Sequence, residues 1–346
     1  MTRVAPKVRL KPDTTYEVPM VVTALVLSTC TLFAQSPGRW ITNTFAPLPQ
    51  PEEEYTAAVA NDRLYLMGGN RGNRKEWPRH VLEYDLAADR WTTKKPVPFP
   101  GDHMAAAALG GKIYVFGGQA EAGIKQPLNT TWEYDPGADS WRPLAPMPTA
   151  RTAAGAVEAG GRIYVVGGNV AGGGTVGIME VYDPAANRWD SRSTMPTPRN
   201  HPAVGAVGGK LYVIGGRLAA PNIGGFTASN TDVVEEYDTV TATWRALNKM
   251  PTPRSGHGFT THQGRIYVAG GEVRDAHMDA IFRDVEVFDP AINDWYRLPP
   301  MPTARHGVNL AGYANRLHAI GGHIAFAATG GTALHTAAHE VFEFTR

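Results

Sequence analysis

The side chains best suited to chemistry in this sequence recur beside six double glycines, which begin at Gly68, Gly117, Gly167, Gly215, Gly270 and Gly321. Sixteen residues before the first glycine of each pair, the chain reads Glu52, Gly101, Arg151, Arg199, Arg254 and Arg305. A guanidinium is a planar fork of N–H donors that matches a carboxylate, so the four arginines favour a site for a carboxylate or an acidic peptide. The alternative is structural: the arginines would bond carbonyl oxygens of the neighbouring repeats, since arginine also satisfies loop carbonyls.

Further polar residues surround the arginine position. The residue after each double glycine is polar in all six repeats and reads Asn70, Gln119, Asn169, Arg217, Glu272 and His323. Close to the arginine position stand Glu53, Glu54, Asp102, His103, His201, His257 and His306. Since acidic residues are concentrated in the first two repeats, the site is expected to be acidic on one side and basic on the other. That asymmetry favours a single bound ligand.

The histidines raise the question of a metal. His201, His257 and His306 lie within three residues of the same repeat offset, and neutral imidazole is a common metal ligand. No local pair combines zinc-like spacing with a carboxylate, and each histidine comes from a different repeat. The sequence therefore predicts no metal and no other cofactor. Gly172–Gly174 is not a phosphate loop, because the lysine and the following helix are missing.

The repeat that carries these residues has a fixed order of elements. In its third copy, the apolar run Ile163–Val166 precedes the double glycine, Glu180–Pro184 carries an aromatic–acid pair, and Trp189 follows. Successive double glycines are 48 to 55 residues apart. A period near 50 residues with these marks indicates a repeat architecture of propeller type.

These residues make the chain resemble the kelch family of β-propellers from about residue 38 onward. The resemblance implies an all-β fold of six four-stranded antiparallel blades, with Thr152–Glu158 as the innermost strand of blade 3. It also implies that the loops entering the innermost strands and those after the double glycines open on one face. The four arginines are then expected around the mouth of the central channel. The repeated tyrosines and tryptophans are expected to pack between blades.

Trp40 predicts how the ring closes. It has the spacing of a repeat's terminal tryptophan, yet no repeat precedes it, and the sixth repeat ends at Glu340–Phe344 without one. Residues 39–45 are therefore expected to supply the outermost strand of the last blade, which removes a free sheet edge.

Composition and charge agree with this architecture. The 346 residues include 38 glycines and 27 prolines, as expected of many short strands joined by turns. The net charge is +1. Residues 1–35 hold four basic and two acidic residues, so the remainder has 29 bases, 30 acids and a net charge of −1. A nearly neutral body predicts no nucleic-acid partner.

The sequence before the repeats is expected to be a leader, residues 1–35, ahead of one propeller domain, residues 36–346. Residues 20–35 are apolar, follow several basic residues and offer a cleavage site near Ala34, which predicts secretion or export to a periplasm. Met20 is an alternative start. Cys30 is the one cysteine of the chain, and a less favoured alternative is a lipoprotein with a lipidated Cys30 as its N-terminus. Neither reading leaves a transmembrane segment or a disulfide in the mature chain.

The loops after the double glycines are long and unequal, and long loops on a rigid scaffold commonly carry function. They span residues 70–80, 217–232, 272–284 and 323–338, and Trp77 lies in the first. Together with the polar positions above, they favour a non-catalytic binding module for a peptide or glycan. A purely structural interaction protein is the alternative that the sequence does not separate from it.

Some secreted six-bladed kelch proteins are similar to sialic acid mutarotases, which implies a second function, cofactor-independent mutarotation of an acidic sugar such as N-acetylneuraminate. Arg199, Arg254 and Arg305 would then hold the carboxylate, and Glu54, His257 or Glu272 would supply acid–base catalysis. A copper oxidase of the galactose oxidase kind is disfavoured. That chemistry uses a cysteine-linked tyrosine and seven blades, whereas Cys30 lies in the leader and six repeats are present.

Overall fold

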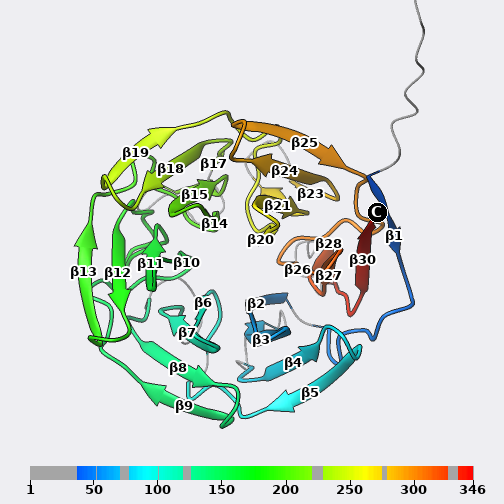
Figure 1. Cartoon of the computed structure of the whole chain (residues 1–346), viewed down its shortest axis with the longest axis horizontal. Helices are drawn as coiled ribbons and strands as arrows, with labels where there is room; N and C mark the ends of the chain where they lie inside the picture. Colours follow the sequence, from blue (N-terminus) through cyan, green and yellow to red (C-terminus); the bar gives the residue numbers. More distant parts are fainter. Residues whose placement is uncertain are drawn as a thin grey trace, which may run out of the picture. The chain divides into compact units, whose positions relative to one another are not determined.

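The computed structural model describes residues 37–51, 53–70, 78–99, 101–119, 126–219, 229–274, 279–325 and 334–345. They belong to one compact unit, Ser36–Arg346. Six four-stranded antiparallel sheets stand around a central channel, so the predicted six-bladed propeller is confirmed (Figure 1). In the part of the chain described, no helix has the length and hydropathy that a membrane span requires.

Each blade runs from an innermost to an outermost strand, and blades 1 to 3 are built from consecutive strands. Blade 1 contains β2 (Glu53–Ala60), β3 (Arg63–Asn70), β4 (Val81–Asp85) and β5 (Arg90–Lys94). Blade 2 contains β6 (Ala105–Leu109), β7 (Lys112–Phe116), β8 (Thr131–Asp135) and β9 (Ser140–Pro143). Blade 3 contains β10 (Gly155–Ala159), β11 (Arg162–Val166), β12 (Met179–Asp183) and β13 (Arg188–Arg192).

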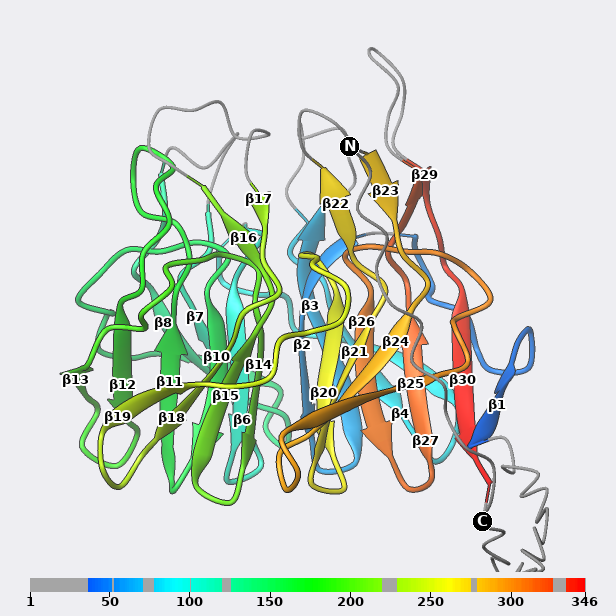
Figure 2. The same ribbon diagram turned by 90° about the horizontal axis from the view of Figure 1, so that it is seen from above.

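Blades 4 to 6 each carry an extra two-stranded ribbon between their second and third strands. Blade 4 contains β14 (Ala203–Val207), β15 (Lys210–Ile214), β18 (Val234–Asp238) and β19 (Thr243–Ala246), with the ribbon β16 (Arg217–Leu218) and β17 (Ser229–Asn230). Blade 5 contains β20 (Gly258–His262), β21 (Arg265–Ala269), β24 (Val285–Asp289) and β25 (Asp294–Leu298), with the ribbon β22 (Glu272–Arg274) and β23 (Asp279–Ile281). Blade 6 contains β26 (Asn309–Tyr313), β27 (Arg316–Ile320) and β30 (His339–Phe344), with the ribbon β28 (His323–Ala325) and β29 (Leu334–His335). The labelled ribbon strands rise on one face of the ring (Figure 2).

The fourth strand of blade 6 comes from the other end of the chain. β1 (Gly38–Ile41) pairs antiparallel with β30, and Trp40 lies opposite Phe342. The predicted closure by an N-terminal strand is therefore confirmed. It leaves blade 6 with the same four-strand width as the other blades, and no blade is left with an exposed third strand.

The repeated aromatic residues join neighbouring blades, as predicted. Each terminal tryptophan donates its indole N–H to a carbonyl oxygen in the connection before its own blade, at 2.7 to 3.1 Å; for Trp40 the acceptor is Pro299. The tyrosines of the third strands are fully buried, and Tyr84 donates its hydroxyl to Asp89 at 2.6 Å. A buried hydroxyl with a partner avoids a desolvation penalty, so these rings contribute apolar packing without leaving a polar atom unsatisfied.

Candidate functional site

At the mouth of the channel, one residue in each blade has a left-handed backbone conformation. These residues stand fourteen positions before each double glycine and have φ between 49° and 59°: Glu54, His103, Ala153, His201, Gly256 and Gly307. All six line the central cavity, whose volume is about 450 Å³. The turn also corrects the predicted innermost strand of blade 3, which begins at Gly155 and not at Thr152, because Ala153 breaks the ladder between them.

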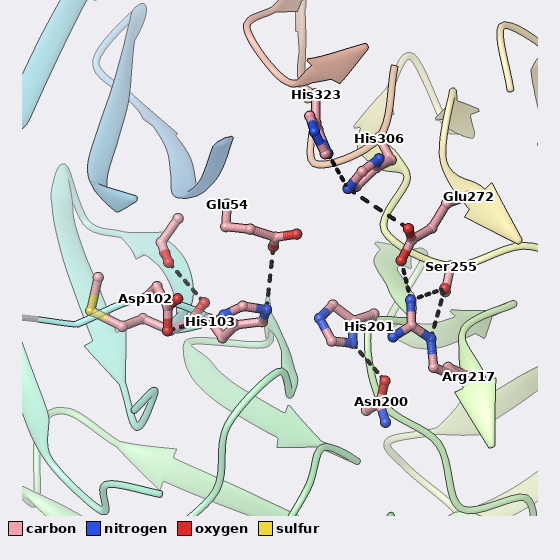
Figure 3. A network of polar contacts seen from close by, with 12 residues as sticks. Glu54, Asp102, His103, Asn200, His201, Arg217, Ser255, Glu272, His306 and His323 are labelled. Carbon is pink, nitrogen blue, oxygen red and sulfur yellow. Dashed lines mark hydrogen bonds and ion pairs between the residues drawn. The ribbon is translucent and has the colours of Figure 1, made fainter. Parts of the chain in front are cut away.

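Three of these left-handed residues meet across blades 1, 2 and 4. The carboxylate of Glu54 lies 3.7 Å from Nε2 of His103, and the rings of His103 and His201 are 5.0 Å apart between centroids (Figure 3). Possible ligand atoms of the three side chains all lie within 4.8 Å of one another. Desolvation and nearby positive groups lower the pKa of His201 well below its ordinary value, so this imidazole is neutral at pH 7.

A second polar cluster forms the opposite wall of the mouth (Figure 3). Arg217 donates to Glu272 and, at 3.1 Å, to the hydroxyl of Ser255. The other oxygen of Glu272 lies 3.7 Å from Nε2 of His306, and this nitrogen is 3.1 Å from Nδ1 of His323. Guanidinium, carboxylate and imidazole thus form one continuous chain of contacts over blades 4 to 6.

The residue that follows each double glycine pairs with the residue that stands fifteen positions before the first glycine of the same pair. The two backbones form a short bridge, in the pairs Asp102 and Gln119, Thr152 and Asn169, Asn200 and Arg217, Ser255 and Glu272, and His306 and His323. In blade 1 the backbones of Glu53 and Asn70 pair in the same way. The bridges therefore place two polar residues per blade at the mouth. Within the described part of the chain, the buried oxygens Oε1 of Gln119 and Oγ1 of Thr152 have no hydrogen-bond partner.

The four arginines do not line the mouth, so the expected ring of donors is wrong. Their side chains are at most 1% exposed, and each guanidinium pairs with a buried glutamate of its own blade at 2.7 to 2.9 Å. The pairs are Arg151 and Glu180, Arg199 and Glu235, Arg254 and Glu286, and Arg305 and Glu340. A ligand at the mouth has no access to them.

The arginines hold consecutive blades together. The carbonyl oxygen of each accepts a hydrogen bond from the second glycine of the preceding blade, as between Gly168 and Arg199 at 2.9 Å. Its guanidinium then reaches carbonyl oxygens of its own blade, as from Arg199 to Val213 at 2.9 Å. These contacts support the structural alternative. The carbonyl oxygens that the side chain reaches, however, belong to the arginine's own blade and not to a neighbouring one.

Gly168 shows why two glycines are required at this junction. Its φ is +95°, and an added Cβ would lie 2.7 Å from the carbonyl oxygen of Thr152. Both the left-handed backbone and the close approach of its own blade's loop exclude a larger side chain. At Gly167, with φ of +69°, an added Cβ would lie 2.5 Å from the carbonyl oxygen of Arg199, so the arginine loop of the next blade packs against the double glycine.

The remaining predicted residues fall into three groups. His257 is buried, and burial together with Arg254 lowers its pKa to about 3, which makes it a weak base. The side chain of Asn169 accepts a hydrogen bond from the amide of Asn200 at 2.9 Å. Asn70 is placed by its backbone in β3, and Trp77 lies outside the described residues.

The charge of the mouth also differs from the expectation. Among the described residues there, Glu54, Asp102 and Glu272 are acidic and Arg217 is the basic one, already paired with Glu272. The expected basic side is therefore reduced to one neutralised guanidinium. Because the four buried arginines are unavailable, an anionic ligand has little to attract it in this part of the mouth.

The sequence identified Glu54, His103 and His201 as candidates, but not that they share one left-handed position of the repeat. The left-handed residues recur at a constant offset from the glycines, and they include two glycines and an alanine among chelating side chains. That mixture is the signal that could have found them, since a position that accepts glycine in two blades needs no side chain for folding. A metal was not expected because His201, His257 and His306 come from different blades; of these only His201 joins a possible ligand group, with Glu54 and His103 of blades 1 and 2.

Comparisons with known proteins agree with the fold. The KLHDC2/KLHL20/DRC7 Kelch-repeats domain matches residues 31–191 and 144–322. The Kelch-like protein terF of Aspergillus terreus is 30% identical over 343 residues, which cover 91% of this chain and 72% of terF. Beta-scruin of Limulus polyphemus is 29% identical over 113 residues, 32% of this chain and 12% of beta-scruin.

A solved structure, titled "Structure of YjhT", superposes with a TM-score of 0.69. The likeness covers 85% of this chain and 96% of that chain at 21% sequence identity. At this identity the likeness shows the fold alone, so the chemistry of the mouth has to be argued from its own residues.

Proposed function

The chain belongs to the kelch-repeat family, and we propose that it is a binding module whose ligand, a neutral polyhydroxylated molecule of the sugar class, lies at the mouth of the central channel. The observation that carries the proposal is the ring of paired polar residues, two per blade, at the base of the loops and ribbons. Kelch propellers commonly act as binding modules, and here the largely buried polar ring lies beside a cavity that is lined by Glu54, His103 and His201.

The chemistry of the ring favours hydroxyl groups. Amide, hydroxyl, carboxylate and imidazole groups alternate around it, so donors and acceptors lie side by side. A sugar hydroxyl both donates and accepts a hydrogen bond and can satisfy such mixed neighbours. The partly exposed side chains of Glu54 and His103, which line the cavity, can reach such a hydroxyl. A cavity of about 450 Å³ is in the size range of small-ligand sites.

The charge of the mouth separates this proposal from binding of an anion. Three carboxylates and one paired guanidinium among the described residues repel an acidic sugar or acidic peptide. A neutral glycan carries no such penalty. The peptide alternative is less well supported, because the bridges of the ring are isolated pairs and do not form a continuous strand.

The proposal is tested by the melting temperature of the full chain in the presence of neutral mono- and oligosaccharides, N-acetylneuraminate and acidic peptides. A ligand that binds only the folded state raises the melting temperature with concentration. We expect a shift with a neutral sugar that is lost in Glu54→Gly, a change that the left-handed backbone accepts, and kept in Lys249→Gln, an exposed lysine outside the mouth. A shift with acidic peptides alone, or one that survives Glu54→Gly, would reject this assignment.

A second candidate, cofactor-independent mutarotation, is favoured by the facing carboxylate and imidazole of Glu54 and His103. In ring opening, Glu54 would accept the proton of the anomeric hydroxyl while His103, protonated, donates to the ring oxygen as its bond to the anomeric carbon breaks. Closure on the other face reverses both transfers. Exchange between anomers, followed by NMR, should accelerate with the wild type and return to the buffer rate in Glu54→Gln.

Export remains a prediction, because residues 1–36 lie outside the described part of the chain. We propose that the leader directs the propeller across a membrane, as its apolar segment and basic residues indicate. Sequencing the N-terminus of the protein recovered from its native host tests this. A mature chain beginning near Gln35 is expected, and a chain that retains residues 20–34 would contradict it.

A further inference from the structure

Three left-handed residues at the channel mouth have the composition of a transition-metal site. Glu54, His103 and His201 come from blades 1, 2 and 4, and their possible ligand atoms all lie within 4.8 Å of one another. Ala153, the left-handed residue of blade 3, occupies the place between the two histidines and is too small to separate them. The rings of His103 and His201 therefore approach edge to face at 5.0 Å (Figure 3).

Both histidines are oriented by the residue that precedes them. Nδ1 of His103 is 3.0 Å from Oδ1 of Asp102, and Nδ1 of His201 is 2.5 Å from Oδ1 of Asn200. The contact of His201 is a hydrogen bond, which fixes the proton on Nδ1 and makes Nε2 the metal-binding atom. In His103 the negative charge of Asp102 favours the same arrangement. For His103 this is the nitrogen that faces Glu54 at 3.7 Å. Outer acceptors of this kind are typical of histidines that bind a metal.

The backbone gives an independent reason to assign a role to these side chains. Left-handed φ values disfavour residues with a Cβ, and Gly256 and Gly307 show that the same turn forms without any side chain. Glutamate and histidine at this position are therefore not required for the fold. Their side chains project into the cavity, where Glu54 is 19% and His103 20% exposed.

We propose that Glu54, His103 and His201 bind a divalent transition-metal ion, most suitably Zn²⁺, at the mouth of the channel. Two imidazole nitrogens beside one carboxylate suit zinc and its first-row neighbours better than calcium or magnesium, which prefer oxygen ligands alone. The acidic residues of the mouth also attract a cation. With three protein ligands, the ion keeps coordination positions open toward the cavity.

The geometry requires only local adjustment. Ligand atoms bound to one zinc ion at about 2.0 to 2.2 Å lie about 3.3 Å from each other, compared with separations of up to 4.8 Å in the structure. Glu54 is partly exposed, whereas His201 is held by its hydrogen bond to Asn200 and His103 lies beside the carboxylate of Asp102. Rotation of the Glu54 side chain toward the two imidazoles closes the site. This inference does not depend on the proposed sugar ligand.

The test uses the full chain, treated with chelator, dialysed and titrated with Zn²⁺ by calorimetry, with bound metal measured by elemental analysis. We expect one equivalent in the wild type and at least 100-fold weaker binding in His103→Gly/His201→Gly. This variant is expected to fold, because glycine occupies the same position in blades 5 and 6; circular dichroism checks it. His306→Gln, on the opposite wall, is the matched control and should bind as the wild type does.

Titration with Co²⁺ adds a readout of the ligands themselves. Visible absorption bands of four- or five-coordinate Co²⁺ should appear in the wild type and in His306→Gln but not in the double glycine variant. The proposal is overturned if the wild type binds less than a tenth of an equivalent of Zn²⁺. It is also overturned if the folded double variant binds as tightly as the wild type, or if binding is lost in His306→Gln and kept in the double variant.

Discussion

In blade 4, the guanidinium of Arg199 and the imidazole of His201 leave the backbone two residues apart and end in opposite surroundings. Arg199 is fully buried, pairs with Glu235 at 2.9 Å and ties its blade to the preceding one. His201 has a left-handed backbone and projects into the cavity toward Glu54 and His103. The turn between them reverses the direction of the side chain, from the interior of a blade to the channel.

The two positions also differ in how they vary around the ring. Arginine occurs in blades 3 to 6, the same blades that carry a buried glutamate two residues before the third-strand aromatic ring. Blades 1 and 2 have Leu82 and Trp132 at that glutamate position and no arginine. The left-handed position accepts glutamate, histidine, alanine or glycine, and its residue type does not vary together with one other position in the blade. Paired variation indicates a packing role, and unpaired variation leaves a position available for function.

The largest effect is expected from breaking an arginine–glutamate pair. Arg199→Met leaves the carboxylate of Glu235 buried without its guanidinium, and removing one partner of a buried pair costs about 3 to 5 kcal/mol. Adding Glu235→Leu, which restores the residue type of blade 1, should recover much of that loss, since no buried charge remains. The free energy of unfolding from urea titrations measures both. Equal losses in the single and double variants would show that the pair is not the source of the stability.

A smaller effect is expected from acid, through histidines inside blade 6. Nδ1 of His318 is 2.9 Å from Nε2 of His339, and burial lowers their pKa values to about 3 and about 4. Because the unfolded chain binds protons below about pH 6.5 and the folded chain does not, stability is complete above that pH and falls toward pH 4. The expected loss between pH 7 and pH 5 is about 2 kcal/mol per histidine.

A double substitution that copies the residues of the neighbouring blade tests the acid effect. His318→Tyr/His339→Val restores the residue types that blade 5 holds at Tyr267 and Val285. Its free energy of unfolding should fall between pH 7 and pH 5 by about 2 to 4 kcal/mol less than that of the wild type. If both proteins lose the same stability, the titrating groups lie elsewhere, and the histidines of the mouth become the next to examine.

The sequence predicted the ring well and the site only in part. The number of blades, the strand order and the closure through Trp40 follow from the double glycines, aromatic–acid pairs and tryptophans that recur in the repeats. These residues recur because each blade packs against its neighbours in the same way. The role of Arg199 depends on Glu235, which is 36 residues away, and only the sheet register shows that they meet. The meeting of Glu54, His103 and His201 depends on ring geometry and on a backbone conformation that glycine, alanine and histidine share.

The smallest expected effect tests the premise that the left-handed position is strained. Ala153 has φ of 55°, and its methyl group makes no polar contact, so Ala153→Gly removes the strain without removing an interaction of another kind. The free energy of unfolding should rise by about 0.5 to 1 kcal/mol. The control is Ala156→Gly, in the middle of β10, where glycine should lower stability through its greater freedom in the unfolded chain. If Ala153→Gly also lowers stability, the left-handed turn favours a side chain. The backbone conformation then gives no reason to assign a function to Glu54, His103 and His201.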